Sequence, residues 1–265
     1  MMPAGYSRSA LDWPHFLAAM VLVTVRLGGL MVFAPVLSSE AIPARIKAAF
    51  VLAISVLLAP LISALPSAHA DLGVTAVLGE LSVGLVLGLS LSLVSEMLLF
   101  AGQLLGFQFS FSLVNLLDPN SLVQTPLMGQ LFTLMGTVIL IAAGLHRTVL
   151  LALVRSFTSM PVGAVFFDGA AGLSLVRLMS GVFFAALQLA APVLAATLLA
   201  EVTVAVLGKI SPQLPVMMVA VPAKTLLGYT VLIGSLALWP AFIESRFSGL
   251  LDGAEQLIRR AVVAR

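Results

Sequence analysis

The chain has 265 residues, of which 61% are hydrophobic and only 9% are charged, and its mean hydropathy is +1.17. A soluble domain carries roughly 25% charged residues, because its water-facing surface must be covered by polar groups. This composition therefore excludes a soluble globular protein and indicates an integral membrane protein. The chain contains no cysteine, which excludes disulfide bonds, cysteine-ligated zinc and iron–sulfur clusters. The net charge of +2 is carried by scattered basic residues, a distribution that does not indicate nucleic-acid binding.

Six apolar runs are separated by short polar or turn-forming segments. They cover residues 16–37, 48–65, 72–105, 127–154, 170–207 and 216–243. The first run is longer than the core of a signal peptide and has no small-residue cleavage site after it, so we expect it to be a membrane helix. Crossing a bilayer takes roughly 20 apolar residues, and the six runs thus predict about six passes.

The third and fifth runs exceed one crossing, so their helices must tilt, break or extend beyond the bilayer. Prolines inside the runs favour kinks and breaks. These are Pro35, Pro60, Pro192, Pro222 and Pro240. We predict an all-α, polytopic membrane protein of long, kinked helices.

The polar connection after the first run contains Pro43, Arg45 and Lys47. We expect the two basic residues to lie in a polar turn between the first two helices, with proline starting the second helix. An orientation with the N-terminus inside places this pair outside, and the reverse orientation misplaces most other basic residues, which conflicts with the positive-inside rule. Hairpins that do not cross the membrane simply would explain the conflict.

Small residues recur along the third run and beyond it, at Gly84, Gly88, Gly102 and Gly106. Such spacing lets helix backbones approach closely in a membrane, and we interpret these glycines as helix-packing residues. The alternative is that glycine is simply common in membrane helices.

Six charged residues are embedded in the apolar runs. They are Arg26, Glu80, Glu96, Arg177, Glu201 and Lys224. Such residues face protein or water and indicate a functional site by default, for example an ion-coupled transport site, which needs converging carboxylates. Glu80 and Glu96 would lie about 160° apart around a straight helix, so we favour roles in assembly or inter-subunit contact, together with Arg45 and Lys47.

The segment 106–120 has no lysine or arginine and alternates phenylalanine with polar residues. At period two, Phe107, Phe109 and Phe111 would share one face of an extended loop, and Asp118-Pro119 would form its turn. Alternatively, the three phenylalanines are ordinary packing residues at a helix end. No nucleophile–base pair, phosphate loop or metal-ligand spacing is present in the sequence, and we predict no catalytic, cofactor-binding or metal site.

Four stretches in order along the chain resemble the R-subunit family of the flagellar export gate (the FliR family) and its injectisome relatives of the SctT type. They are Arg26 to Ser38 with Ile42-Pro43-Ala44-Arg45-Ile46-Lys47; Gly106-Phe107-Gln108 to Asp118-Pro119-Asn120-Ser121; Gly144-Leu145-His146 with Ser156-Phe157 and Met160-Pro161-Val162-Gly163; and Ala191-Pro192 to Glu201 with Ser211-Pro212-Gln213-Leu214 and Val221-Pro222-Ala223-Lys224. The chain departs from the family pattern at Gly144-Leu145, where asparagine-glycine is usual, and at Val219-Ala220-Val221, where aromatic-glycine-phenylalanine is usual.

The resemblance implies a P-like part over residues 1–208 and a Q-like helical hairpin over residues 209–265. It implies assembly with P-type and Q-type subunits and with a larger export-apparatus membrane subunit, in the bacterial inner membrane at the flagellar basal body. The cargo would be unfolded proteins, and membrane lipid would surround the subunit. No cofactor would be needed, because a separate ATPase and the proton-motive force supply the energy for export. The 106–120 loop would then be a hydrophobic plug across the channel. The competing interpretations are an injectisome counterpart, a small-solute or ion-coupled transporter, and, least supported, an intramembrane enzyme.

Overall fold

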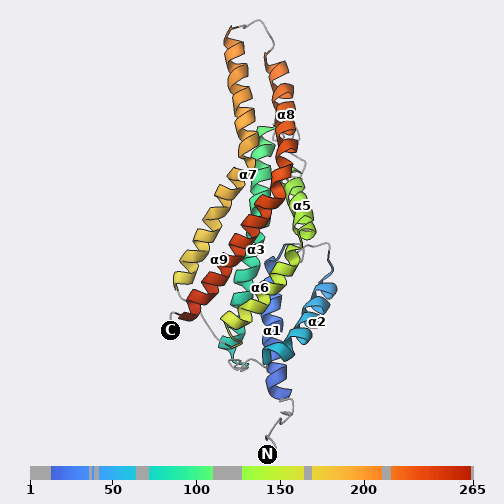
Figure 1. Cartoon of the computed structure of the whole chain (residues 1–265), viewed down its shortest axis with the longest axis vertical. Helices are drawn as coiled ribbons and strands as arrows, with labels where there is room; N and C mark the ends of the chain where they lie inside the picture. The colour runs from blue at the N-terminus through green and yellow to red at the C-terminus, as the bar shows by residue number, and fades with distance from the viewer. Residues whose placement is uncertain are drawn as a thin grey trace, which may run out of the picture. The chain divides into compact units, whose positions relative to one another are not determined.

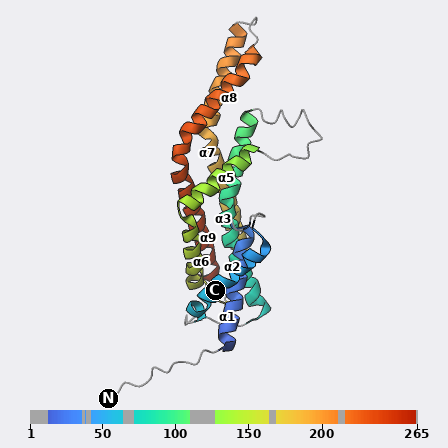
Figure 2. The same cartoon turned by 90° about the vertical axis from the view of Figure 1, so that its right-hand side faces the viewer.

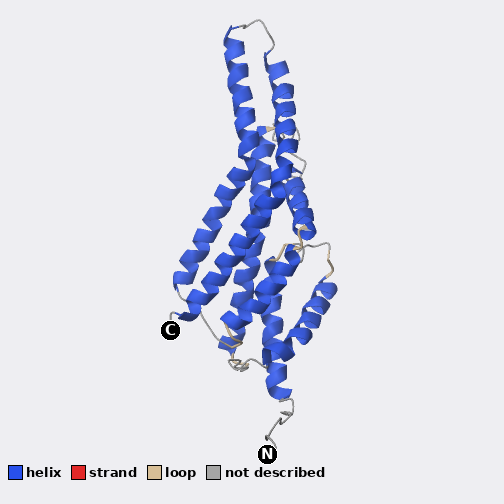
Figure 3. Cartoon of the chain, viewed as in Figure 1, coloured by secondary structure: helices blue, strands red, loops and turns tan. Residues whose placement is uncertain are grey.

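The secondary structure of the described residues is helical throughout (Figure 3). This computed structural model describes residues 13–35, 38, 42–63, 72–109, 127–163, 169–210 and 216–263. Its elements are α1 (Trp13–Phe33), α2 (Ala44–Ser63), α3 (Val74–Gln108), α5 (Leu127–Ala142), α6 (Leu145–Ser159), α7 (Gly169–Ile210), α8 (Val216–Ser235), the 3-10 helix η1 (Leu236–Leu238) and α9 (Trp239–Val263). The predicted all-α class is confirmed.

Five helical stretches are long and apolar enough to cross a membrane, and α5 together with α6 would make a sixth. This agrees with the predicted polytopic membrane protein. The over-long third and fifth runs form continuous helices, α3 with 35 residues and α7 with 42. At 1.5 Å per residue these helices are about 53 and 63 Å long, whereas the hydrocarbon core of a bilayer is about 30 Å thick. Each therefore tilts strongly or extends beyond the bilayer.

The chain forms two compact units, each built from segments far apart in sequence. Unit 1 comprises Met1–Leu91, Val149–Ser174 and Leu251–Arg265, and unit 2 comprises Ser92–Thr148 and Leu175–Leu250. The helices α3, α6, α7 and α9 consequently contribute residues to both units. The division into a P-like part over 1–208 and a Q-like part over 209–265 rests on the resemblance and stays a prediction.

Unit 1 is built around α1, which lies beside α2 (Figures 1 and 2) and packs against the first half of α3. Leu22 and Leu30 of α1 are at most 2% exposed, as are Leu87 and Leu91 of α3. Lipid tails are as apolar as leucine, so burial alone does little to hold membrane helices together, and close packing must do so. The helix α2 buries one stripe of residues, spaced three or four positions apart, in unit 1. It consists of Val51, Ser55, Ala59 and Ile62.

Unit 2 joins the second half of α3 to α5, α7, α8 and the start of α9. A Cβ on Gly136 of α5 would clash with the Leu98 side chain of α3, which shows how closely these two helices pack. The Phe132 ring of α5 meets Trp239 edge-to-face, with ring centroids 4.6 Å apart. Aromatic pairs in this geometry add to the packing energy.

Within the described residues, the fourth apolar run contains a helix break that proline placement did not predict. The helices α5 and α6 are separated at Ala143 and Gly144, and Gly144 has a φ of +70°, a conformation that favours glycine. By contrast, Pro60, Pro192 and Pro222 lie inside continuous helices. Neighbouring helices and side chains can satisfy the backbone groups that proline frees in a membrane helix.

Two adjacent glycines of α1 provide a test of the α1–α3 contact. A Cβ on Gly29 would lie 2.8 Å from the Leu81 carbonyl oxygen, whereas a Cβ on Gly28 would meet no atom within 4 Å. We expect Gly29→Ala to lower the free energy of unfolding by about 1–3 kcal/mol, the usual cost of overpacking. The control Gly28→Ala should raise it by up to about 1 kcal/mol, because alanine is the better helix former. Denaturant unfolding of the purified protein in micelles measures both, and equal stabilities would contradict the close contact.

Candidate functional site

A buried arginine forms the polar centre of unit 1. Arg26 of α1 is 0% exposed, and its Nε donates to Glu80 Oε2 of α3 at 2.5 Å. Its Nη1 donates to Ser156 Oγ of α6 at 3.1 Å, and its Nη2 donates to the Met160 carbonyl oxygen, also at 3.1 Å. The Phe157 ring lies 4.1 Å from the Arg26 Cζ atom, within cation–π range. One guanidinium thus connects α1, α3 and α6 with the turn that follows α6.

Glu80 completes the centre from the side of α3. It is also 0% exposed, and while Oε2 accepts from Arg26, Oε1 accepts the backbone N–H of Gly163 at 3.0 Å. Gly163 has a φ of +86°, a region that disfavours residues with a Cβ. Ser156 Oγ in turn donates to the Leu153 carbonyl oxygen at 2.6 Å. Both charges are therefore paired and hydrogen-bonded, as buried charges must be.

The spacing of small residues on α3 explains why Arg26 reaches Glu80. Glu80, Gly84 and Gly88 follow each other at four-residue intervals and share one face of the helix. A Cβ on Gly84 would clash with the Arg26 carbonyl oxygen, and a Cβ on Gly88 would lie 2.5 Å from that of Leu30. The α1 backbone thus rests directly on these two glycines, one turn from the Glu80 carboxylate.

This centre holds helices together and is not arranged for a chemical reaction; we call this structural role a clamp. Taking two charges out of water carries a large desolvation cost, which good geometry and further hydrogen bonds offset. The geometry fixes the turn Met160–Gly163 against α1 and α3. Arg26 and Glu80 are bonded to each other inside the chain and neither side chain reaches the surface, so within this chain they hold helices together. A role for them in assembly stays a prediction.

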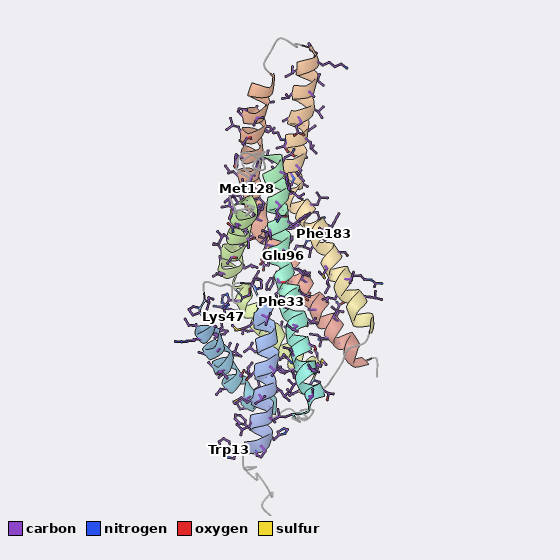
Figure 4. The ribbon with its side chains drawn as sticks, turned by 180° about the vertical axis from the view of Figure 1, so that it is seen from behind. Trp13, Phe33, Lys47, Glu96, Met128 and Phe183 are labelled. Atoms are coloured by element: carbon purple, nitrogen blue, oxygen red, sulfur yellow. The ribbon has the colours of Figure 1, made fainter. Side chains whose placement is uncertain are left out.

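The other embedded charges of the chain lie in unit 2. Lys224 Nζ of α8 donates to Glu201 Oε1 of α7, and the two side chains are 16% and 46% exposed respectively. Glu96 is exposed on α3 (Figure 4) and has no hydrogen bond or ion pair within the described residues. Inter-subunit roles for Glu96, Glu201 and Lys224 stay predictions.

Arg45 and Lys47 do not lie in a connecting turn, contrary to expectation. Both belong to the first turn of α2, whose start is set by the Pro43 carbonyl oxygen accepting the N–H groups of Ile46 and Lys47 at 2.9 and 3.3 Å. Lys47 Nζ reaches back to the Ser38 carbonyl oxygen at 3.1 Å, at the end of α2 visible in Figure 4. Proline can occupy this cap position because it needs no amide hydrogen there. A role for this basic pair in assembly stays a prediction.

The remaining packing glycines, Gly102 and Gly106, differ from each other. A Cβ on Gly102 would lie 2.5 Å from the Met128 carbonyl oxygen and 2.6 Å from the Gly129 Cα atom, so the α3 and α5 backbones are in contact. A Cβ on Gly106 would find only the Met128 Cβ atom at 3.7 Å, an ordinary contact. The structure therefore requires glycine at the first position and leaves room for alanine at the second.

The expected extended face of phenylalanines is wrong where the structure describes it. Phe107 belongs to α3 and is 68% exposed, whereas Phe109, just after the helix, is 5% exposed. The Phe109 ring stacks on Tyr229 of α8, with centroids 4.8 Å apart, and rests against Gly228. The helical backbone turns alternate residues to different faces, so the two phenylalanines do not share one. The remaining predicted residues of this segment, Phe111, Asp118 and Pro119, lie outside the described residues.

Residues 17–250 match the family described as bacterial export proteins, family 1. The chain belongs to this family. Several relatives are named flagellar biosynthetic protein FliR. The one from Caulobacter vibrioides is 31% identical over 236 residues, which are 87% of this chain and 93% of the relative. The one from Bacillus subtilis is 26% identical over 91% of this chain and 94% of its own, and the one from Escherichia coli is 23% identical over 91% and 93%.

Several residues of these sites carry no predicted role in the sequence analysis. Ser156, Met160 and Gly163 lie in stretches that resemble the family. No spacing rule links Ser156 and Met160 to Arg26, 130 and 134 positions away, or Gly163 to Glu80, 83 positions away. For the Phe109 contact, the sequence does contain a signal: Tyr229 is one of two tyrosines in the chain and lies in an apolar run. The Tyr229 side chain is half-buried, and a tyrosine inside an apolar run usually marks a specific contact.

The buried pair should be far more sensitive to substitution than the partly exposed pair. We expect Arg26→Gln or Glu80→Gln to lower the free energy of unfolding by about 3–5 kcal/mol, because each leaves one buried charge uncompensated. Arg26→Lys should not rescue, since an ammonium lacks the planar fork that reaches several acceptors. The matched control Glu201→Gln should cost at most about 1 kcal/mol, as exposed ion pairs do. Unfolding in detergent micelles measures all four variants.

A double substitution distinguishes the cost of leaving one buried charge without its partner from the cost of losing the whole ion pair. Arg26→Met combined with Glu80→Met removes both charges and should recover most of the stability lost in either Gln variant. A clamp role is contradicted if Arg26→Gln proves no more harmful than Glu201→Gln.

Proposed function

We propose that this chain is a structural and gating subunit of the flagellar protein export gate. In this proposal it assembles with P-type and Q-type subunits, and with the larger membrane subunit of the export apparatus, in the bacterial inner membrane at the basal body. Unfolded flagellar proteins pass through the channel that the subunits form. The observation that carries the proposal is the family match over residues 17–250, together with FliR-named relatives that align along nearly their whole length.

The surface of the helices supports assembly with other proteins. Large apolar side chains are exposed along α2, α7 and α8, including Leu57 at 75%, Leu199 at 69% and Leu226 at 69%. A bilayer can cover only about 30 Å of such surface, and α7 is about twice that length. Apolar helix surface that projects beyond the bilayer has to be covered by other subunits.

The use of the charged residues favours a structural role over transport. A proton or ion carrier needs a carboxylate that exchanges with water and converges with others near the midplane. Glu80 is sealed against Arg26, and Glu201 is bound to Lys224. Of the three embedded carboxylates, Glu96 alone is exposed and without a partner among the described residues, so they do not form a set of free carboxylates. We therefore propose that these groups hold helices in place, and that the chain is neither an ion-coupled transporter nor an enzyme.

The plug proposal changes in the light of the two phenylalanines. Phe109 is an anchor, since its ring is seated between Tyr229 and Gly228. Of the two predicted plug phenylalanines that the structure describes, Phe107 is the exposed one, at 68%, and is available to close a pore. We propose that Phe107, with Phe111 and the Asp118-Pro119 turn, forms the plug, which would close a narrow pore by expelling water.

Co-expression with candidate P-type and Q-type subunits, followed by native mass spectrometry, tests the assembly. We expect this chain to co-purify in a complex of fixed stoichiometry, because its exposed apolar surface needs partners. Isolation as a single chain that moves a solute or protons in liposomes would instead support a transporter.

Separate alanine variants distinguish plug from anchor in the assembled gate. Phe107→Ala should leave the stability of the complex within about 0.5 kcal/mol, as surface changes usually do, while ion leak across reconstituted membranes increases. Phe109→Ala should lower stability by about 3–5 kcal/mol, the cost of deleting a buried phenylalanine. Unchanged leak with Phe107→Ala would assign that side chain to packing or lipid contact and remove it from the plug.

A further inference from the structure

A cavity of about 270 Å³ lies within unit 2 between α3, α7 and α9. Its floor is apolar and well buried. The floor residues are Leu93 and Met97 of α3 with Val182 and Ala185 of α7, each at most 8% exposed. The floor side chains come from two different helices, so the cavity is a hollow between α3 and α7.

Two arginines stand at this hollow, Arg177 of α7 and Arg246 of α9. The Arg177 side chain has no hydrogen bond or ion pair within the described residues. Arg246 donates one Nη2 bond to Gln188 Oε1 and lies 5.1 Å from the centroid of the Phe242 ring, which leaves most of its five N–H donors unused. Since the described lining contains no carboxylate, two positive charges face an apolar hollow without an anion.

The position of Arg177 along its helix suits a headgroup. It is the third residue of the apolar stretch Leu175–Ile210 that could cross a membrane. Long basic side chains near the end of a membrane helix extend to the level of the lipid phosphates.

Two glycines keep the hollow open. Gly181 of α7 and Gly249 of α9 both line the cavity, and a Cβ on either would meet no atom within 4 Å. Neither glycine is required for helix contact, in contrast to Gly84 or Gly102. Larger side chains at these positions would therefore fill the hollow rather than disturb the packing of helices.

We propose that this cavity binds one anionic phospholipid, with its phosphate between Arg177 and Arg246 and an acyl chain along the apolar floor. Arginine binds phosphate through paired, charge-assisted hydrogen bonds, and basic pockets between membrane helices take anionic lipid headgroups. A carboxylate from a partner protein would match one guanidinium and leave the apolar floor uncovered. An amphiphile matches both parts of the site.

Native mass spectrometry of the full-length chain tests this binding, with phosphatidylglycerol as the probe and phosphatidylethanolamine as its zwitterionic counterpart. The wild-type chain should retain one phosphatidylglycerol preferentially. Arg177→Gln and Arg246→Gln should each lower that affinity about tenfold, as the loss of one charge-assisted contact does. The charge control Lys209→Gln, an exposed basic residue of α7 that does not line the cavity, should leave it unchanged.

A steric variant tests the cavity without changing charge. Gly181→Leu should abolish the preferential binding while the melting temperature is maintained. The matched control Gly234→Leu, at a glycine of α8 that also has open space around it, should bind like the wild type.

Three results would overturn the proposal. The first is equal retention of the two lipids, or retention that is unaffected by the arginine variants. The second is displacement of phosphatidylglycerol by inorganic phosphate alone, which would make this a simple anion site. The third is loss of a protein subunit from the co-expressed complex in the arginine variants with unchanged lipid content, which would make the hollow a protein contact.

Discussion

Unit 1 depends on one buried ion pair, between Arg26 of α1 and Glu80 of α3. A buried charge without a partner in this interior would cost several kcal/mol. The two side chains must therefore stay in contact in any stable arrangement of α1 and α3. The guanidinium has three acceptors and the carboxylate also accepts the Gly163 amide. The pair thereby fixes the relative positions of α1, α3, α6 and the turn Met160–Gly163. Its contribution is specificity of arrangement more than net stability, since a well-packed apolar pair could replace it.

The ion pair is possible only because helix backbones touch beside it. Gly84 and Gly88 leave room for the α1 backbone, and Gly29 leaves room for that of α3. In a membrane, close approach of this kind replaces much of the work that the hydrophobic effect does in water. The same device recurs in unit 2, where Gly102 meets the start of α5. Small residues thus set the helix contacts, and the buried charges select one register.

The sequence is informative about local features and silent about distant pairings. Helix positions and the packing face of α3 follow from apolar runs and four-residue spacing, which are properties of one segment. The partnership of Arg26 and Glu80 spans 54 positions and involves a turn after α6, and no periodicity encodes it. The alternation of phenylalanine with glutamine and serine predicts an extended segment in which Phe107 and Phe109 share one face. The structure continues α3 through Gln108, so Phe107 is exposed and Phe109 is seated against Tyr229. Helix breaks are equally hard to predict from the sequence. The break at Gly144 falls where there is no proline, while Pro60, Pro192 and Pro222 lie inside continuous helices.

These contacts bear on function through the rigidity that they give to unit 1. In the proposed export gate, this subunit would have to hold its fold while cargo passes, and unit 1 would supply a fixed body through charges that are sealed within the chain. The most direct measurement is a cryo-electron microscopy structure of the assembled complex at side-chain resolution. The account predicts the Arg26 guanidinium within hydrogen-bond distance of Glu80, Ser156 and the Met160 carbonyl oxygen of the same chain, with the Gly163 amide on Glu80. Density that places Arg26 or Glu80 against a neighbouring subunit, or in contact with water in the channel, would contradict it.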